Sequence, residues 1–187
     1  MELQHLVAKI LVDGVIGIDP VRVVDVFHSW VAKQSMPEML VDVAELLHVP
    51  KGPGVIAVGH DADYTLDHTG GVWGMAYRRK TQLAGGNAER IVQALHAAAH
   101  AARLLEDAFP GELRFSRTDF ELIVNDRGLV PNTAETYAAV VPEIEAALRG
   151  LAGGGAFAFT RHDSDPRLRF GLTIKSSKPL DLAAVSA

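Results

Sequence analysis

The sequence predicts a single α+β domain over residues 1–187, with an antiparallel or mixed sheet and helices packed on one face. Three observations favour this class. Apolar runs of strand length alternate with amphipathic helical stretches, and a strand-turn-helix pattern near the N-terminus recurs in the second half of the chain. The composition is that of an ordinary globular protein, with 48% hydrophobic and 22% charged residues and no cysteine. A chain of this length can bury an adequate core without disulfides or metal.

The first half is predicted to form a strand, a helix and three further strands. Leu6–Val12 is rich in branched apolar residues and ends at the turn signal Asp13-Gly14. The helix begins with Asp19 as its cap and Pro20 at its first position, and its apolar stripe faces the sheet. Composition and alternation predict the further strands over 39–46, 54–58 and 72–79, separated by two loops.

The second half is predicted to repeat this order after a linking helix over 87–109. A strand over 120–124 precedes a helix that Asn132 caps and that reaches residue 148. Because its apolar stripe continues through Pro142, we expect one kinked helix, with a restart at this proline as the alternative. A hairpin closes the fold with a strand over 168–174, and residues 176–187 form a tail.

Two pairs of segments indicate an internal duplication. Residues 10–14 with the helix start after them resemble residues 122–126 with theirs, and residues 54–63 resemble residues 155–165. We therefore predict two related strand-helix-strands units, over 6–80 and 113–175, joined by the helix over 87–109.

Two His-Asp-x-Asp elements are the candidate metal or acid–base residues. An imidazole beside carboxylates can hold a divalent ion or transfer a proton. The alternative is a pair of hairpin connections in which Asp stabilises the turns. The candidate ligands of a divalent metal are His60, Asp61, Asp63, His162, Asp163 and Asp165.

A second candidate site is a small-anion site built from a rigid loop and a basic run. The loop over 48–54 is rich in proline and glycine, and its backbone amides and lysine can surround an anion, although the order of a P-loop is missing. The alternatives are a plain connector and a solvated strand edge. The candidate ligand-binding residues are Lys51, Gly52, Gly54, Arg78 and Arg79.

The segment over 40–80 resembles a family of uncharacterised bacterial proteins that is common in cyanobacteria. The resemblance rests on His48-Val-Pro, Gly52-Pro-Gly, Gly59-His and Ala62-Asp-Tyr. It covers roughly a quarter of the chain and implies a bacterial cytoplasmic protein, but it assigns no catalytic residue.

Charge and hydropathy exclude several classes of partner. A net charge of −5 disfavours nucleic acid, and histidines and an arginine interrupt the most apolar helix, so we expect no membrane span. The acidic N-terminus and the absence of cysteine favour the cytoplasm. We expect a non-catalytic binding or assembly module that forms a homodimer or binds a protein partner. The alternatives are a metal-dependent hydrolase or lyase and a small-anion sensor.

Overall fold

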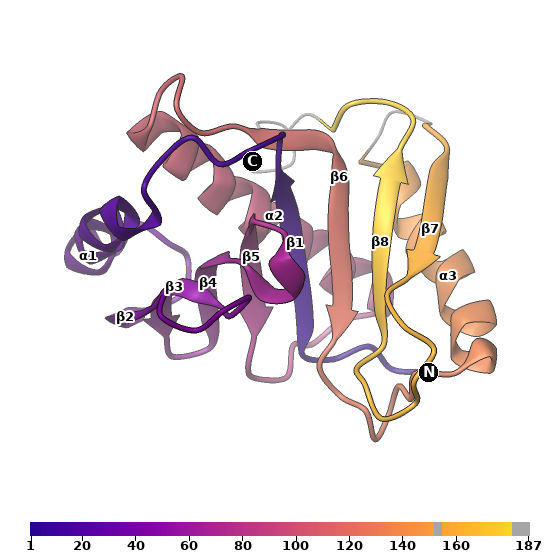
Figure 1. Cartoon of the computed structure of the whole chain (residues 1–187). Helices are drawn as coiled ribbons and strands as arrows, with labels where there is room; N and C mark the ends of the chain where they lie inside the picture. The colour runs from indigo at the N-terminus through magenta and orange to yellow at the C-terminus, as the bar shows by residue number, and fades with distance from the viewer. Residues whose placement is uncertain (152–154, 181–187) are drawn as a thin grey trace.

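The computed structural model describes residues 1–151 and 155–180 and arranges their strands in one antiparallel sheet (Figure 1). The α+β class predicted from the sequence is confirmed. The strand order is β2-β3-β4-β5-β1-β6-β8-β7. The strands are β1 (Leu6–Val12), β2 (Leu40–Leu46), β3 (Gly54–Gly59), β4 (Ala62–Asp67), β5 (Gly74–Arg79), β6 (Phe115–Val124), β7 (Phe157–Arg161) and β8 (Gly171–Ser176).

Three α-helices in the described part of the chain cover one face of this sheet. Helix α1 contacts β2 and β3, α2 packs on β1 and β5, and α3 lies against α2 and β7. Their bounds are α1 (Val23–Lys33), α2 (Asn87–Ala108) and α3 (Ala134–Arg149), and two 3-10 turns are η1 (Pro20–Arg22) and η2 (Thr69–Gly71). The expected single helix through Pro142 is confirmed in α3, but its cap is Thr133, whose side chain accepts a hydrogen bond from the Thr136 amide.

Strand alternation separates a core face from an open face. Leu6, Ala8 and Ile10 of β1 belong to the hydrophobic core beneath the helices. Val7 and Lys9 therefore point to the opposite face, on which no α-helix of the described residues packs. This open face carries most of the polar side chains discussed below.

The centre of the sheet is the antiparallel pair of β1 and β6. In each half, the strand before the helix also pairs with the last strand of that half, β1 with β5 and β6 with β8. Two copies of one unit related by a twofold axis would give this order. The duplication itself stays a prediction.

Several predicted boundaries need correction. Residues 62–67 were expected in a loop but form β4, and the strand expected over 168–174 begins only at Gly171, which leaves Leu168 exposed. The expected tail begins inside β8, and Leu180 is buried with its amide donating to the Arg117 carbonyl. Residues 181–187 of that tail lie outside the described residues.

Candidate functional site

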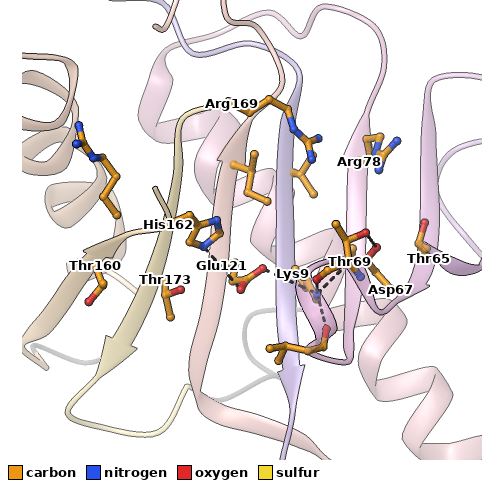
Figure 2. Close-up of a pocket in the computed structure, with 16 residues that line it drawn as sticks. Lys9, Thr65, Asp67, Thr69, Arg78, Glu121, Thr160, His162, Arg169 and Thr173 are labelled. Carbon is orange, nitrogen blue, oxygen red and sulfur yellow. Dashed lines mark hydrogen bonds and ion pairs between the residues drawn. The ribbon is translucent and has the colours of Figure 1, made fainter. Parts of the chain in front are cut away.

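The largest set of polar side chains on the open face surrounds a cavity of about 430 Å³ at the centre of the sheet (Figure 2). This volume lies within the range of small-molecule sites. Strands from both halves supply the lining, which comprises Val7, Lys9, Thr65, Asp67, Thr69, Gly70, Val72, Ala76, Arg78, Glu121, Ile123, Thr160, Arg161, His162, Arg169 and Thr173.

One row of directly paired residues crosses the cavity floor. Residues in direct register on antiparallel strands point to the same face, so the whole row faces the cavity. Its members, from β4 to β7, are Thr65, Ala76, Lys9, Glu121, Thr173 and Thr160. The register of the sheet therefore fixes the relative positions of these side chains.

Lys9 is a buried cation with a complete set of partners. Its side chain is 2% exposed, and its Nζ lies 2.7 Å from Asp67 Oδ2 and 2.7 Å from the Val72 carbonyl oxygen. The Thr69 carbonyl is a weaker acceptor at 3.4 Å. Gly74 makes room for the stem, because a β-carbon there would lie 2.8 Å from Lys9 Cγ. Lys9 thus anchors the η2 loop to the sheet and has no donor to spare.

His162 and Glu121 form a second titratable pair in the cavity. The Nε2 atom of His162 lies 3.7 Å from Glu121 Oε1, and Glu121 Oε2 lies 3.9 Å from Lys9 Nζ. Burial lowers the pKa of His162, Glu121 opposes this effect, and the cations Lys9 and Arg169 lower the pKa further. The imidazole is therefore neutral at pH 7 and can either donate or accept a hydrogen bond.

Two arginines approach each other on one side of the row. Figure 2 shows the guanidinium of Arg169 reaching over β1 toward Arg78 of β5. Burial lowers the pKa of Arg169, and Arg78 and Arg127 lower it further, while Asp67 acts in the opposite direction. The Arg169 Nη1 donates to Asn125 Oδ1 at 3.3 Å, whereas the side chain of Arg78 makes no hydrogen bond or ion pair with any described residue.

A third arginine leaves a buried donor unused. Arg161 ends β7, and its Nη1 is buried without a hydrogen-bond partner among the described residues. Arg161 pairs in register with the core residue Leu172, so its side chain points to the helix-covered face and not into the cavity. An unsatisfied buried donor costs free energy unless a ligand or water accepts from it. The carboxylates that line the cavity, Asp67 and Glu121, lie beside Lys9 and His162. The side of the cavity that carries Arg78 and Arg169 can therefore accept an oxyanion.

The first His-Asp-x-Asp element borders this cavity without lining it, since Asp63 pairs in register with Arg78 but is not among the lining residues. His60 and Asp61 form the turn between β3 and β4, where the His60 Nδ1 is 3.4 Å from Asp61 Oδ1. The hydroxyl of Thr81 donates to Asp61, and Asp63 accepts hydrogen bonds from Lys80 Nζ at 2.8 Å and the Gly59 amide. These contacts are those of a hairpin connection.

The second element contributes one residue to the cavity, His162. Asp163 accepts from the Asp165 amide, and Asp165 pairs with Arg167 at 2.6 Å, so both carboxylates shape the loop after β7. Four strand spacings, about 19 Å, separate β4 from β8. The structure therefore does not bring the two elements together, and within residues 1–151 and 155–180 no three His, Asp or Glu side chains are grouped to hold a metal.

The proline- and glycine-rich loop over 48–54 packs against His68 and η2 and does not line the cavity. The Gly52 carbonyl accepts from the His68 amide at 3.2 Å, and the stem of Lys51 packs beside Gly71 in η2. Gly54 begins β3 with φ of 73°, a conformation that favours glycine. Lys51, Gly52 and Gly54 are not among the residues that line the cavity.

Arg78 and Arg79 point to opposite faces because strand side chains alternate. Arg78 lines the cavity, whereas Arg79 Nε donates to the Thr81 carbonyl and its Nη1 lies 3.8 Å from Glu38. Of the five anion-site residues expected from the sequence, the cavity therefore contains only Arg78.

The sequence did not single out Lys9, Glu121 and Arg169 as site residues. Lys9 offered a signal, since it is the one polar residue of the apolar strand Leu6–Val12. Glu121 and Arg169 offered none, because each occupies an ordinary outward position in an alternating pattern.

Fold and site together define an α+β protein with a cationic cavity on the open face of its sheet. Comparisons with protein-family models, with curated proteins and with solved structures found no match. In the part of the chain that the structure describes, no helix is long and apolar enough to cross a membrane.

Proposed function

We propose that this chain is a binding protein for a small anionic ligand, held on the open face between Arg78 and Arg169. The observation that carries the proposal is the approach of two arginines with no carboxylate bonded to either. Like charges repel in a partly buried site, so an arrangement of this kind gains most when an anion lies between them.

The remaining lining supports the same conclusion. The cavity volume of about 430 Å³ suits a small metabolite rather than a polymer. The net charge of −5 means that these arginines form a local positive site on an otherwise acidic protein.

Titration calorimetry with orthophosphate, sulfate, citrate and malonate tests this proposal on the wild type and on Arg78→Gln and Arg169→Gln. Each variant is expected to weaken binding roughly 10- to 150-fold, the range for loss of a hydrogen bond to a charged group. Arg103→Gln is the matched control, since it removes the same charge from an exposed pair with Asp107 on α2. Absence of binding by every anion, or binding that neither cavity variant weakens, would overturn the proposal.

We also propose self-association, for which β2 provides the surface. β2 is an edge strand of the sheet, Val41 on it is 53% exposed, and Met39 just before it is 56% exposed. An edge strand with exposed apolar side chains can pair with a second copy. Light scattering is expected to show a dimer that Val41→Lys dissociates, and a monomer at all concentrations would exclude it.

A further inference from the structure

We infer that the anionic ligand is a short hydroxylated acid, with its acid group at Arg78 and Arg169 and its hydroxyl groups over the row that contains Glu121. This inference rests on the proposed function and adds the chemical class of the ligand. The shared chemistry is an oxyanion on a hydroxylated carbon chain, whether a carboxylate or a phosphate ester.

Glu121 is a shielded carboxylate that lacks hydrogen-bond donors, which hydroxyl groups of a ligand can supply. Its side chain is only 16% exposed, and it accepts no hydrogen bond from any described residue, since its contacts with His162 and Lys9 are 3.7 Å and 3.9 Å. A shielded carboxylate without donors is costly. An anionic group of the ligand cannot approach it, whereas a hydroxyl group can donate to it.

Three threonine hydroxyls extend the same row. Thr173 is the direct neighbour of Glu121, Thr160 follows on β7, and Thr65 lies at the other end on β4. None of the three hydroxyls has a hydrogen-bond partner among the described residues, although all line the cavity. A hydroxyl both donates and accepts, so it matches another hydroxyl better than it matches an anion alone.

The distance between the arginine pair and the row that contains Glu121 sets the length of the ligand. Arg78 belongs to the next row on this face, with Val7 and Ile123, two residues along each strand from Lys9 and Glu121. Two residues of a strand span about 7 Å. Figure 2 shows both arginines on one side of the row that carries Glu121 and Thr173. The acid group and the hydroxyl groups are therefore separated by a few carbon atoms.

The floor between the two polar groups is apolar. Val7, Ile123 and Ala76 lie there and offer no hydrogen-bonding side chain. The carbon chain of a short hydroxylated acid can pack on this patch while its polar ends reach the arginines and Glu121. A wholly polar inorganic anion would leave the patch uncovered.

The test compares ligands that differ only in their hydroxyl groups. Glycerol 3-phosphate against propyl phosphate forms the phosphate arm, and glycerate against propionate forms the carboxylate arm. In at least one arm, calorimetry is expected to show roughly tenfold or tighter binding of the hydroxylated member. The arm with the larger preference identifies the acid group.

Variants then assign the preference to named residues. Glu121→Gln and Thr173→Val are expected to reduce the hydroxyl preference to roughly threefold or less, while Thr173→Ser, which keeps the hydroxyl, preserves it. Circular dichroism verifies that each variant is folded. Equal binding within both pairs would overturn this inference and leave the anion-binding function intact. A hydroxyl preference that survives both Glu121→Gln and Thr173→Val would also overturn the inference of a hydroxylated ligand. Failure of every anion to bind would remove both this inference and the proposed anion-binding function.

Discussion

The imidazole ring of His162 lies directly over Gly171, the first residue of β8. A β-carbon on residue 171 would come within 2.6 Å of His162 Nδ1 and 3.2 Å of its Cε1. Since real β-carbons do not approach other atoms so closely, the position of the ring in the cavity depends on this glycine having no side chain.

Gly171→Ala is therefore expected to displace His162 and to destabilise the protein by about 1–3 kcal/mol, the usual cost of overpacking. Urea unfolding measures the change. Gly150→Ala is the matched control, because its nearest neighbour would be 3.9 Å away and its φ is −65°. Equal stability of Gly171→Ala and the control would show that the ring can move without cost.

Removal of Lys9 should leave Asp67 as a buried charge without its partner. We expect Lys9→Met to lower the free energy of unfolding by about 3–5 kcal/mol, the cost of breaking a buried ion pair. In an Asp67→Asn background the same substitution should cost less, because no carboxylate is left unpaired. A double-mutant cycle in urea measures this coupling, and strictly additive losses would contradict it.

Arg78 should contribute to anion binding but not to the free energy of unfolding. Arg78→Gln removes a cation that raises the free energy of its neighbour Arg169, so stability should stay within about 0.5 kcal/mol of the wild type or increase. Arg90 provides the contrast, since it donates to the Leu83 carbonyl at 2.8 Å and to Glu2 at 2.9 Å. Arg90→Gln is expected to cost about 1.5–3 kcal/mol in thermal or urea unfolding. Comparable losses in the two variants would mean that Arg78 has a structural role.

The stability of the protein should depend on the ionisation of His162. Burial lowers its pKa below the unfolded value of 6.5, so the unfolded chain binds this proton more readily than the folded protein does. The contribution of the neutral His162 imidazole to the free energy of unfolding is complete above pH 6.5 and is lost as the pH falls through that value. Urea unfolding of the wild type and His162→Gln should therefore give a stability difference that moves in favour of the variant as the pH falls. A difference that is independent of pH would contradict this expectation.

The sequence predicted the core better than the site, and particular residues explain why. Leu6–Val12 and the helix on Asn87 carry strong local patterns, and both form where they were expected. β4 was missed because His60 and Asp61 are turn residues, and the polar side chains of Asp63, Thr65 and Asp67 behind them hid the strand signal. The candidate site depends on which strands are neighbours, and the pairing of β1 with β6 brings together Lys9 and Glu121, which are far apart in sequence.

The position of β1 between β5 and β6 also has a consequence for synthesis. The ribosome delivers β5 well before β6, so β1 can pair on one side while its other edge waits for the second half of the chain. During that interval the nascent protein displays an unpaired strand edge and half of a cationic surface, a state prone to association with other chains. The proposed ligand cannot protect it, because Glu121, His162 and Arg169 have not yet been made, so we expect this stage to be the one at which the protein most needs a chaperone.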